Sequence, residues 1–221
     1  MGSGRIAVRA LDPSEASMLD LVIYSRMEPE GETRRVAFNI ERFLKLCPRL
    51  NRKGDKFEGM AFELAERAIT FRVGNTSFGL PVYEPEGSEV PLPSISGNDL
   101  ATDVPTADLL EAVRSFSGLT DRVGLRVLDF DRVVVRGSCD PYGTQGETKE
   151  VTIITSSKAS PSIESAKYDV DRLFRVLMAM KPMAEIITLR WGKDLPLELT
   201  VKAPASPVLS LKFWLASLIE S

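Results

Sequence analysis

Paired carboxylates are the residues of this sequence whose spacing could most readily do chemistry. Asp129 and Asp131 flank a turn, and Asp169 and Asp171 open a helix, so each pair could act in acid–base catalysis or hold Mg²⁺. Both pairs also have local explanations, because acidic residues are favoured in hairpin turns and at helix N-termini. The chain has no histidine, which removes the commonest general base and transition-metal ligand. We therefore expect no enzymatic activity, no metal site and no cofactor.

Basic side chains form a second group, because they recur in segments with helical periodicity. Lysine and arginine on a helix can meet DNA phosphates without reading any base. Solvent-facing helix positions often carry these residues anyway, so the pattern alone leaves a plain solvated surface open as well. The formal net charge is −3, yet a local basic stripe can attract phosphate over a Debye length of about 8 Å. The residues concerned are Arg42, Lys45, Arg49, Arg52, Lys53, Arg114, Arg172, Arg175 and Lys181.

The composition places the chain among ordinary globular proteins. With 221 residues and 43% apolar content, it can bury one or two cores. No run of about 18 apolar residues is present, and the N-terminus lacks the apolar stretch of a signal peptide. Cys47 and Cys139 are isolated and lack a metal-type spacing, so we expect reduced thiols. The sequence predicts an intracellular protein that does not enter a membrane.

Three short helices and the strands around them must position the basic residues. Asn39 is predicted to cap a helix over 38–50 with an apolar stripe at i, i+3, i+4 and i+7, and Pro48 is predicted to end it. A second helix is expected over 106–116, and a third follows Tyr168. Two strands are expected within 8–23, one on each side of a turn, and three more after the last helix. A hairpin is expected from 123–128 and 132–136. Single strands are expected over 56–64, 68–80, 100–104 and 149–155.

The order of these elements suggests an internal repeat. The second half runs strand, helix, three strands, helix, three strands, and the first half shows only the later part of that series. Residues 82–98 are rich in proline, glycine and glutamate, as exposed linkers are. We therefore predict an incomplete N-terminal domain over 1–81, a connecting loop over 82–98 and a C-terminal domain over 99–221.

Several motifs occur in an order that resembles a known family. GRIAVRALDPSEASMLDL begins at Gly4, FNIERFLKL at Phe38, GKDLPLEL at Gly192 and FWLASLIE at Phe213, with the connecting loop between the second and third. Together they resemble sliding DNA clamps of the proliferating-cell nuclear antigen family, of archaeal type. The family's opening strand–helix–strand segment has no match here, and the C-terminus departs from the family's Ala-Pro-basic ending. The resemblance implies an α+β DNA-clamp fold in which two similar domains of antiparallel sheet, with inner helices, form a ring-forming subunit.

The same resemblance implies a function and partners. The chain is expected to be a DNA polymerase processivity factor that encircles double-stranded DNA without sequence specificity. It would tether DNA polymerase, ligase and flap nuclease through their PIP-box peptides in replication and repair. A clamp loader ATPase would open the homotrimer or heterotrimer ring, since this chain has no nucleotide motif. The expected location is the cytoplasm, associated with the nucleoid, or the nucleus in a eukaryote. The alternative is a clamp-fold scaffold, or a specialised subunit of a heterotrimeric clamp, that does not slide independently.

The resemblance also assigns the candidate sites. The basic residues named above become the DNA-binding set of the inner helices, although Glu111 and Met178 stand where the family often has a basic residue. Subunit contacts would use edge strands near 99–104 and 157–167, the latter a poor strand by composition. Alternation predicts that Trp214 points away from its two neighbours, so these three residues cannot share one role. The implied partner-peptide pocket consists of Leu11, Ala16, Met18, Val90, Leu92, Pro196, Phe213, Trp214 and Leu215.

Overall fold

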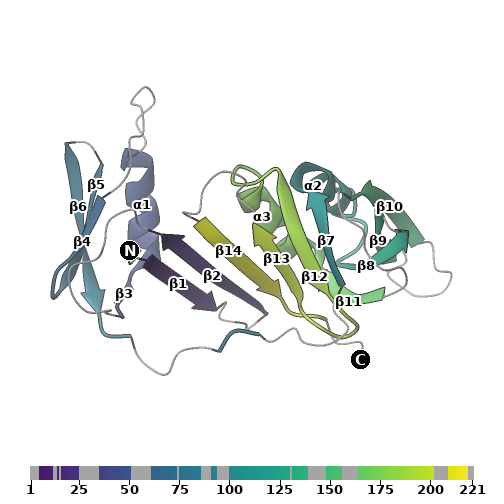
Figure 1. Ribbon diagram of the computed structural model, residues 1–221, viewed down its shortest axis with the longest axis horizontal. Coiled ribbons are helices and arrows are strands. Elements are labelled where there is room, and N and C mark those ends of the chain that lie inside the picture. Colours follow the sequence, from purple (N-terminus) through teal and green to yellow (C-terminus); the bar gives the residue numbers. More distant parts are fainter. Residues whose placement is uncertain are drawn as a thin grey trace. The chain divides into compact units, whose positions relative to one another are not determined.

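The computed structural model divides by its contacts into two units, 1–29 together with 90–221, and 30–89. Each unit is described by itself (Figure 1). The larger unit therefore contains the first two strands of the chain as well as its whole C-terminal half. This grouping follows strand pairing rather than the sequence repeat, so the predicted domain boundaries stay a prediction. The structure describes residues 5–11, 14, 16–24, 35–50, 61–73, 75–85, 91–93, 100–129, 131–138, 148–155, 164–201 and 209–218.

A six-stranded antiparallel sheet joins the two ends of the chain in the larger unit (Figure 1). Its order is β1-β2-β14-β13-β12-β7. The two extended segments predicted within 8–23 are confirmed as the hairpin β1–β2, and β2 pairs with the last strand, β14. The bounds are β1 Arg5–Leu11, β2 Ser17–Tyr24, β7 Leu100–Pro105, β12 Ile186–Trp191, β13 Leu197–Val201 and β14 Leu209–Leu215.

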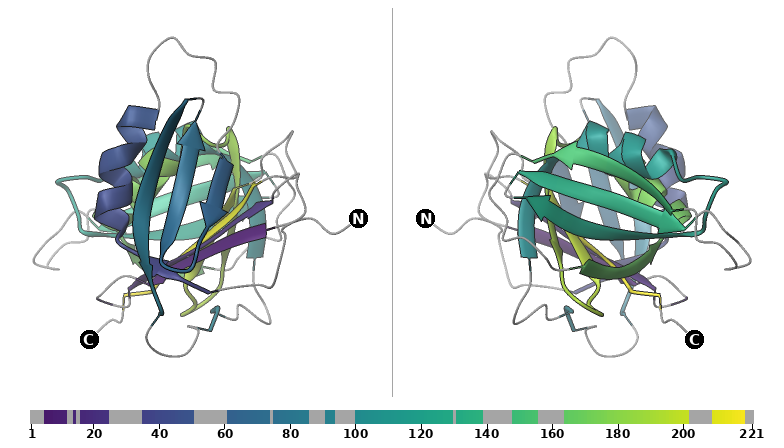
Figure 2. Two further views of the ribbon diagram at one scale, coloured as in Figure 1. Left: turned by 90° about the vertical axis from the view of Figure 1, so that its left-hand side faces the viewer. Right: turned by 90° about the vertical axis from the view of Figure 1, so that its right-hand side faces the viewer.

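A four-stranded sheet of order β10-β9-β8-β11 completes the larger unit, and its strands lie side by side in Figure 2. The predicted hairpin is confirmed by β8 (Arg122–Asp129) and β9 (Arg132–Ser138), and the next predicted strand by β10 (Thr148–Ile154). Of the segment 157–167, which was expected to be a poor continuous strand, only residues 164–167 lie within the described part of the chain. There β11 (Glu164–Asp169) pairs with β8 across a register shift. The sequence did not predict this strand, because its small polar residues have a low β-strand propensity. Pairing with β8 and burial of Tyr168 outweigh that low propensity.

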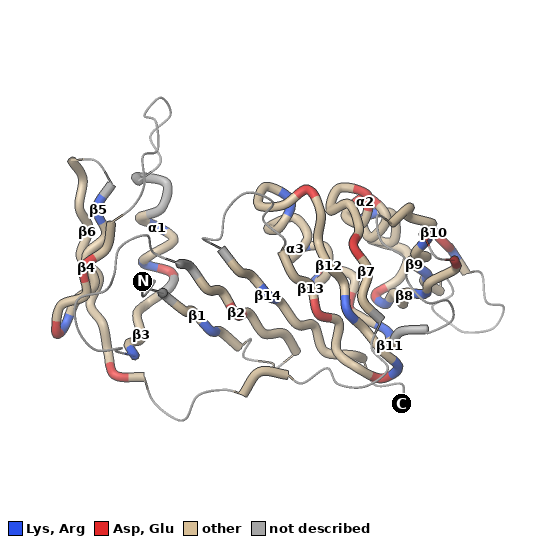
Figure 3. The backbone as a smooth tube through the Cα atoms, viewed as in Figure 1, with Lys and Arg blue, Asp and Glu red and all other residues tan. Residues whose placement is uncertain are grey.

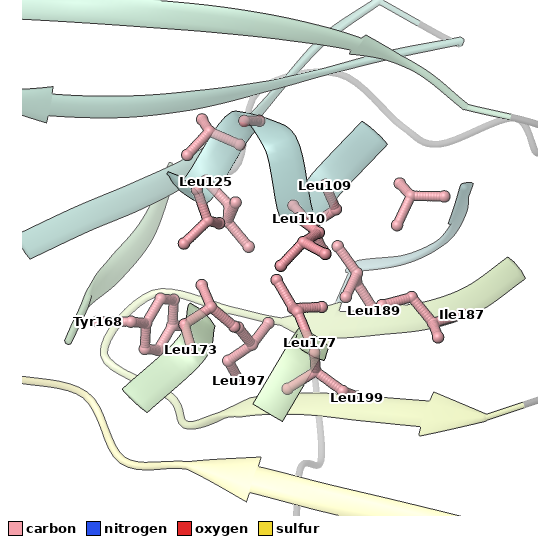
Figure 4. Packing of buried hydrophobic residues seen from close by; sticks show 14 of the residues in the cluster. Leu109, Leu110, Leu125, Tyr168, Leu173, Leu177, Ile187, Leu189, Leu197 and Leu199 are labelled. Atoms are coloured by element: carbon pink, nitrogen blue, oxygen red, sulfur yellow. The ribbon is translucent and has the colours of Figure 1, made fainter. Parts of the chain in front are cut away.

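Helices α2 (Thr106–Arg114) and α3 (Val170–Met180) share one core with both sheets. The predicted apolar face of α2 is buried, and Asp169 caps α3 by accepting a hydrogen bond from the Arg172 backbone N–H at 2.8 Å. Figure 4 shows leucines of both helices meeting side chains of both sheets, among them Leu125 and Leu199. Alternate residues of β13 and β14 face this core. We call the opposite face of the six-stranded sheet its outer face.

The smaller unit contains a second four-stranded antiparallel sheet and one helix, seen side by side in the left-hand view of Figure 2. Asn39 caps α1 as predicted, since its Oδ1 accepts the Arg42 N–H at 2.9 Å. The helix ends at Leu50, the bound that was predicted, but Pro48 does not interrupt it and lies within its last turn. A proline in the last turn removes only one backbone bond, and its fixed φ is helical. The bounds are β3 Ala37–Phe38, α1 Ile40–Leu50, β4 Ala61–Leu64, β5 Ala68–Val73 and β6 Thr76–Tyr83, in the order β3-β6-β5-β4.

The core of the smaller unit is small. Among its described residues, Ile69, Phe71 and Leu80 are the buried apolar ones, and Phe38 and Phe43 pack against them edge-on or tilted. The predicted strand 68–80 is in fact two strands, β5 and β6, which form a hairpin. The residues before Ala61 in the predicted strand 56–64 lie outside the described part of the chain. Across the described residues, no helix is both long and apolar enough to cross a membrane.

Candidate nucleic-acid and partner interfaces

The cations predicted on α1 are only partly described. Arg42 and Lys45 lie on the helix with exposed side chains. Arg49 belongs to α1, but its side chain lies outside the described part of the structure, as do Arg52 and Lys53 altogether. The two described cations follow each other within one turn and leave the opposite side of α1 to Phe43, which packs on the sheet. The geometry therefore permits both to meet a phosphate backbone.

The cations predicted near α2 and α3 are mixed with acids (Figure 3). Arg114 is the basic residue of the last turn of α2, and its side chain is 68% exposed, 4.0 Å from Glu111 Oε2. Arg175 and Lys181 are exposed on α3 and just beyond it. Arg172 is half-buried and donates to Ser14 Oγ at 3.0 Å, so it ties α3 to the segment between β1 and β2. Its guanidinium is therefore partly engaged within the chain.

Acidic residues offset these cations. Asp108 and Glu111 are exposed on α2, and Asp171 is exposed on α3. Within α2 two acids accompany one base, and within α3 one acid accompanies two bases. The summed formal charge of the two helices is thus close to zero, so any attraction of this surface for phosphate is weak and depends strongly on salt.

Three of the predicted partner residues are arranged in a row across the outer face of the six-stranded sheet. Leu11 of β1 lies opposite Met18 of β2, and Met18 lies opposite Trp214 of β14. Trp214 in turn lies opposite Glu198 of β13. Met18 and Trp214 are only 4% and 3% exposed, whereas Leu11 is exposed. The row therefore has three buried side chains, those of Met18, Trp214 and Glu198, and an exposed apolar one, Leu11, at its β1 end.

Glu198 is a member of this row that the sequence did not reveal. It lies in the segment LELTV, where alternation alone predicts an outward-facing acid. The structure buries it, and Trp214 Nε1 donates to its Oε2 at 3.0 Å. Thr200 Oγ1 donates to the other carboxylate oxygen at 3.1 Å, and Lys212 Nζ lies 3.9 Å away. The only available signal was a glutamate between leucines. Whether such a glutamate is buried depends on the strand register, which cannot be predicted from the sequence of that segment.

The other predicted pocket residues divide between the two faces. Phe213 and Leu215 pack with the core on the helix side of the sheet, opposite to Trp214, as the alternation predicted. Ala16 is half-buried, and its carbonyl accepts the Ala216 N–H at 2.8 Å. Pro196 is also half-buried at the start of β13. Leu92 is described and 42% exposed, and Val90 lies outside the described residues.

The carboxylate pairs have the local partners that were expected. Asp169 caps α3, and Asp129 and Asp131 both make ion pairs with Arg132 next to their turn. Within the described part of the chain, no three histidine, cysteine, aspartate or glutamate side chains gather as metal ligands would.

Comparison with known proteins gives these surfaces a context. No family model matches the sequence. A curated relative, the DNA polymerase sliding clamp of Thermofilum pendens, is 23% identical over 228 residues, covering 97% of this chain and 86% of that protein. The structure superposes on the proliferating-cell nuclear antigen (PCNA) of Thermococcus kodakaraensis with a TM-score of 0.72 at 20% identity, over 97% of this chain and 87% of that one. The fold is that of a sliding DNA clamp.

A heteromeric relative has the same clamp fold. The PCNA2–PCNA3 complex of Sulfolobus tokodaii gives a TM-score of 0.72 at 16% identity, with coverage of 97% of this chain and 86% of that one. The resemblance to the proliferating-cell nuclear antigen family and the α+β clamp fold predicted from the sequence are confirmed. The nearly balanced charges of α2 and α3 and the buried Glu198 are features of this chain's own sequence within that fold.

Proposed function

We propose that this chain is a subunit of a sliding clamp, a DNA polymerase processivity factor that encircles duplex DNA. The observation that carries the proposal is similarity over nearly the whole chain, in sequence to a protein named as a DNA polymerase sliding clamp and in fold to PCNA structures. A clamp needs no catalytic group, because it holds DNA by enclosing it. Three of the four candidate carboxylates, Asp129, Asp131 and Asp169, are engaged in a turn and a helix cap.

The DNA-binding part of the proposal relies on exposed cations of the helices. Arg42 and Lys45 of α1 and Arg114 of α2 carry charge on long, flexible stems, which suits sliding because such contacts follow phosphates and ignore bases. Since acids accompany the cations of α2 and α3, free DNA without a closed ring should bind weakly.

The partner-binding part relies on the outer face of the six-stranded sheet. We infer that PIP-box peptides dock against Leu11 and Leu92, with Met18 and Trp214 beneath them. Aromatic and aliphatic anchors dominate peptide interfaces, which supports this choice of surface. Met18 and Trp214 are covered in the structure, so an anchor side chain must displace what covers them before it can contact them.

The proposal is tested by solution mass and by DNA topology. Light scattering of the purified chain should give a mass near three times 24.4 kDa if it closes its own ring. A matching clamp loader should then load the ring onto nicked circular DNA, and cutting the circle should release it. Retention on linear DNA equal to that on circular DNA would contradict encirclement.

A specialised subunit of a heteromeric ring is the second candidate function. The observations that favour it are the structural match to the PCNA2–PCNA3 complex and the charge balance of α2 and α3. This candidate predicts a monomer mass for the chain alone and a ring only after mixing with partner subunits, so the same scattering experiment separates the two candidates.

A further inference from the structure

The smaller unit repeats part of the larger one, element by element. Asn39 caps α1 and Asp169 caps α3 in the same way, each accepting the backbone N–H of the arginine three residues later. Three antiparallel strands follow each helix, β4, β5 and β6 after α1 and β12, β13 and β14 after α3, and they pair in the same order. The larger unit therefore shows what surrounds each element of such a repeat.

In the larger unit, a strand and a helix cover the first of these three strands. β7 pairs with β12 in antiparallel fashion, and α2 begins directly after β7, where the Thr106 N–H donates to the Glu185 carbonyl at 2.8 Å. Leucines of α2 share one core with side chains of β12, and both are seen in Figure 4. Ile187, Leu189 and Trp191 of β12 are consequently fully buried.

The corresponding strand of the smaller unit is open at its edge and on one face. Among the described residues, β4 is an end strand of its sheet. Phe62 and Leu64 of β4 lie opposite Phe71 and Ile69, on the face of the sheet where α1 packs, yet each is 38% exposed. α1 packs over β6, two strands away, and leaves these two side chains uncovered. We call Phe62 and Leu64 the open strip.

The helix α1 also has apolar surface and charge that are not matched within the smaller unit. Leu44 is 59% exposed, whereas Phe174, at the same distance from the cap of α3, packs against the larger core. In sequence, α1 has one acid and three bases, whereas α2, which packs beside α3, has two acids and one base. An acidic helix like α2 is therefore complementary in charge to α1.

We propose that the edge of β4 and the open strip bind a strand–helix segment of another polypeptide, an extended strand that runs directly into an amphipathic, acidic helix. The strand extends the sheet through backbone hydrogen bonds, and aliphatic side chains of the helix bury the open strip. Neither Phe62 nor Leu64 belongs to the proposed DNA-binding set or to the proposed PIP-box surface. The inference therefore goes beyond the proposed function and does not depend on it.

The probe is a synthetic peptide copy of residues 99–117 of this chain. This sequence forms β7 and α2, the strand and helix that occupy the equivalent place in the larger unit. The peptide is labelled with fluorescein, and its anisotropy is measured as the full chain is added. In the control peptide, Leu109→Asp and Val113→Asp remove the aliphatic face of the helix and keep the strand.

Two variants of the full chain test the site itself. Phe62→Lys places a charge in the open strip at an exposed position. Ile154→Lys is the matched control, because Ile154 is also an exposed apolar residue on an end strand, β10 of the larger unit, and gains the same charge. Circular dichroism establishes that both variants are folded.

The expected pattern is specific. The unmodified chain should bind the peptide saturably, and the control peptide should not saturate. Phe62→Lys should weaken binding by about tenfold or more, since an apolar anchor site is lost. Ile154→Lys should change it by less than about twofold.

Hydrogen exchange locates the bound peptide on the chain. At a peptide concentration about 100 times the dissociation constant, amides of β4 and β5 that exchange by opening of the smaller unit should slow by about 100-fold, because the peptide binds only the closed unit. Amides of β7 and β12 should keep their rates, which shows that the peptide has not replaced the chain's own segment.

Several results would overturn the inference. The first two are absence of saturable binding to the unmodified chain, and binding that leaves the exchange of β4 and β5 unchanged. Equal weakening by Phe62→Lys and Ile154→Lys would do the same. Faster exchange of β5 in Phe62→Lys without peptide would mean that the chain itself covers this side chain. A lower solution mass of Phe62→Lys than of the unmodified chain would assign the surface to a second copy instead.

Discussion

At the scale of single residues, Tyr168 links the end of β11 to the loop before β13. The tyrosine is fully buried, and its hydroxyl donates to the Leu195 carbonyl at 2.9 Å. Leu195 follows Asp194, whose φ of 59° is left-handed, and precedes Pro196. The loop that opens β13 is therefore held by one side-chain hydrogen bond as well as by its own turn.

Tyr168→Phe should lower the free energy of unfolding by about 1 kcal/mol, because the Leu195 carbonyl loses its buried donor while the ring still fills the core. Urea denaturation followed by circular dichroism measures the change. Tyr83→Phe is the matched control, since Tyr83 is exposed in the smaller unit, and its midpoint should not move. Equal midpoints for all three proteins would show that the hydroxyl has no structural role.

Leu92→Ala should weaken a PIP-box peptide by about three- to tenfold while leaving the unfolding midpoint unchanged. Leu92 is exposed, so its truncation removes contact area with a partner and little packing within the chain. Isothermal titration measures the affinity. Leu119→Ala, at another exposed leucine beyond α2, should bind like the unmodified chain, and a loss of the same size there would mean that the effect is not local.

At the scale of elements, a lysine side chain from β10 caps the C-terminal end of α2. Lys149 of β10 donates to the Ser115 carbonyl at 2.5 Å, and its ammonium lies 5.2 Å from the centre of the Phe116 ring. A cation here is favoured because the last carbonyls of a helix carry partial negative charge. One residue thus joins a sheet edge to a helix that is proposed to face DNA.

Lys149→Met should lower the free energy of unfolding by about 1 to 2 kcal/mol, through loss of the helix cap and the cation–π contact. Chemical denaturation is the measurement. Lys193→Met is the control with the same change in charge at an exposed turn position, and little effect is expected there. If both variants lose the same stability, net charge rather than the cap is responsible.

Reversing the charges of Lys45 and Arg114 together, by substitution with glutamate, should weaken DNA binding by the loaded ring without unfolding the protein. Two lost phosphate contacts reduce the slope of log affinity against log salt concentration by up to about 1.8. Reversal of Arg67 and Lys193 changes the net charge equally at exposed turn positions and is the control. DNA synthesis with a loader and polymerase that responds equally to both variants would contradict the assignment of the helices to DNA.

The elements that the sequence predicted well are those specified by local signals. Asn39 accepts the hydrogen bond that its type and position implied, and the hairpin β8–β9 turns where two aspartates indicated. Long-range pairing decided the rest. The strand β11 exists because β8 pairs with it, and Glu198 is buried because β14 places an indole opposite. The hydrophobic periodicity of a single segment could predict neither the strand β11 nor the burial of Glu198.

At the scale of the whole molecule, the two units should open separately. The described part of the smaller unit has a core of three buried apolar residues, whereas one large core joins both sheets and both helices of the larger unit. In hydrogen exchange at low urea, amides of β5 and β6 should exchange at least about tenfold faster than those of β8 and β9. Amides of β2 should follow the larger unit, because β2 pairs with β14. Exchange of β2 together with β5 would contradict the division into these units.

The pairing of β2 with β14 also sets the order in which the protein can be completed during synthesis. Met18 and Trp214 are opposite each other but 196 residues apart (214 − 18). At translation rates of about 5 to 20 residues per second, β14 is synthesised about 10 to 40 s after its partner β2. An isolated hairpin is only marginally stable in water, and an unpaired strand edge invites pairing with other chains. The hairpin β1–β2 is therefore open to pairing with other chains until β14 has been made.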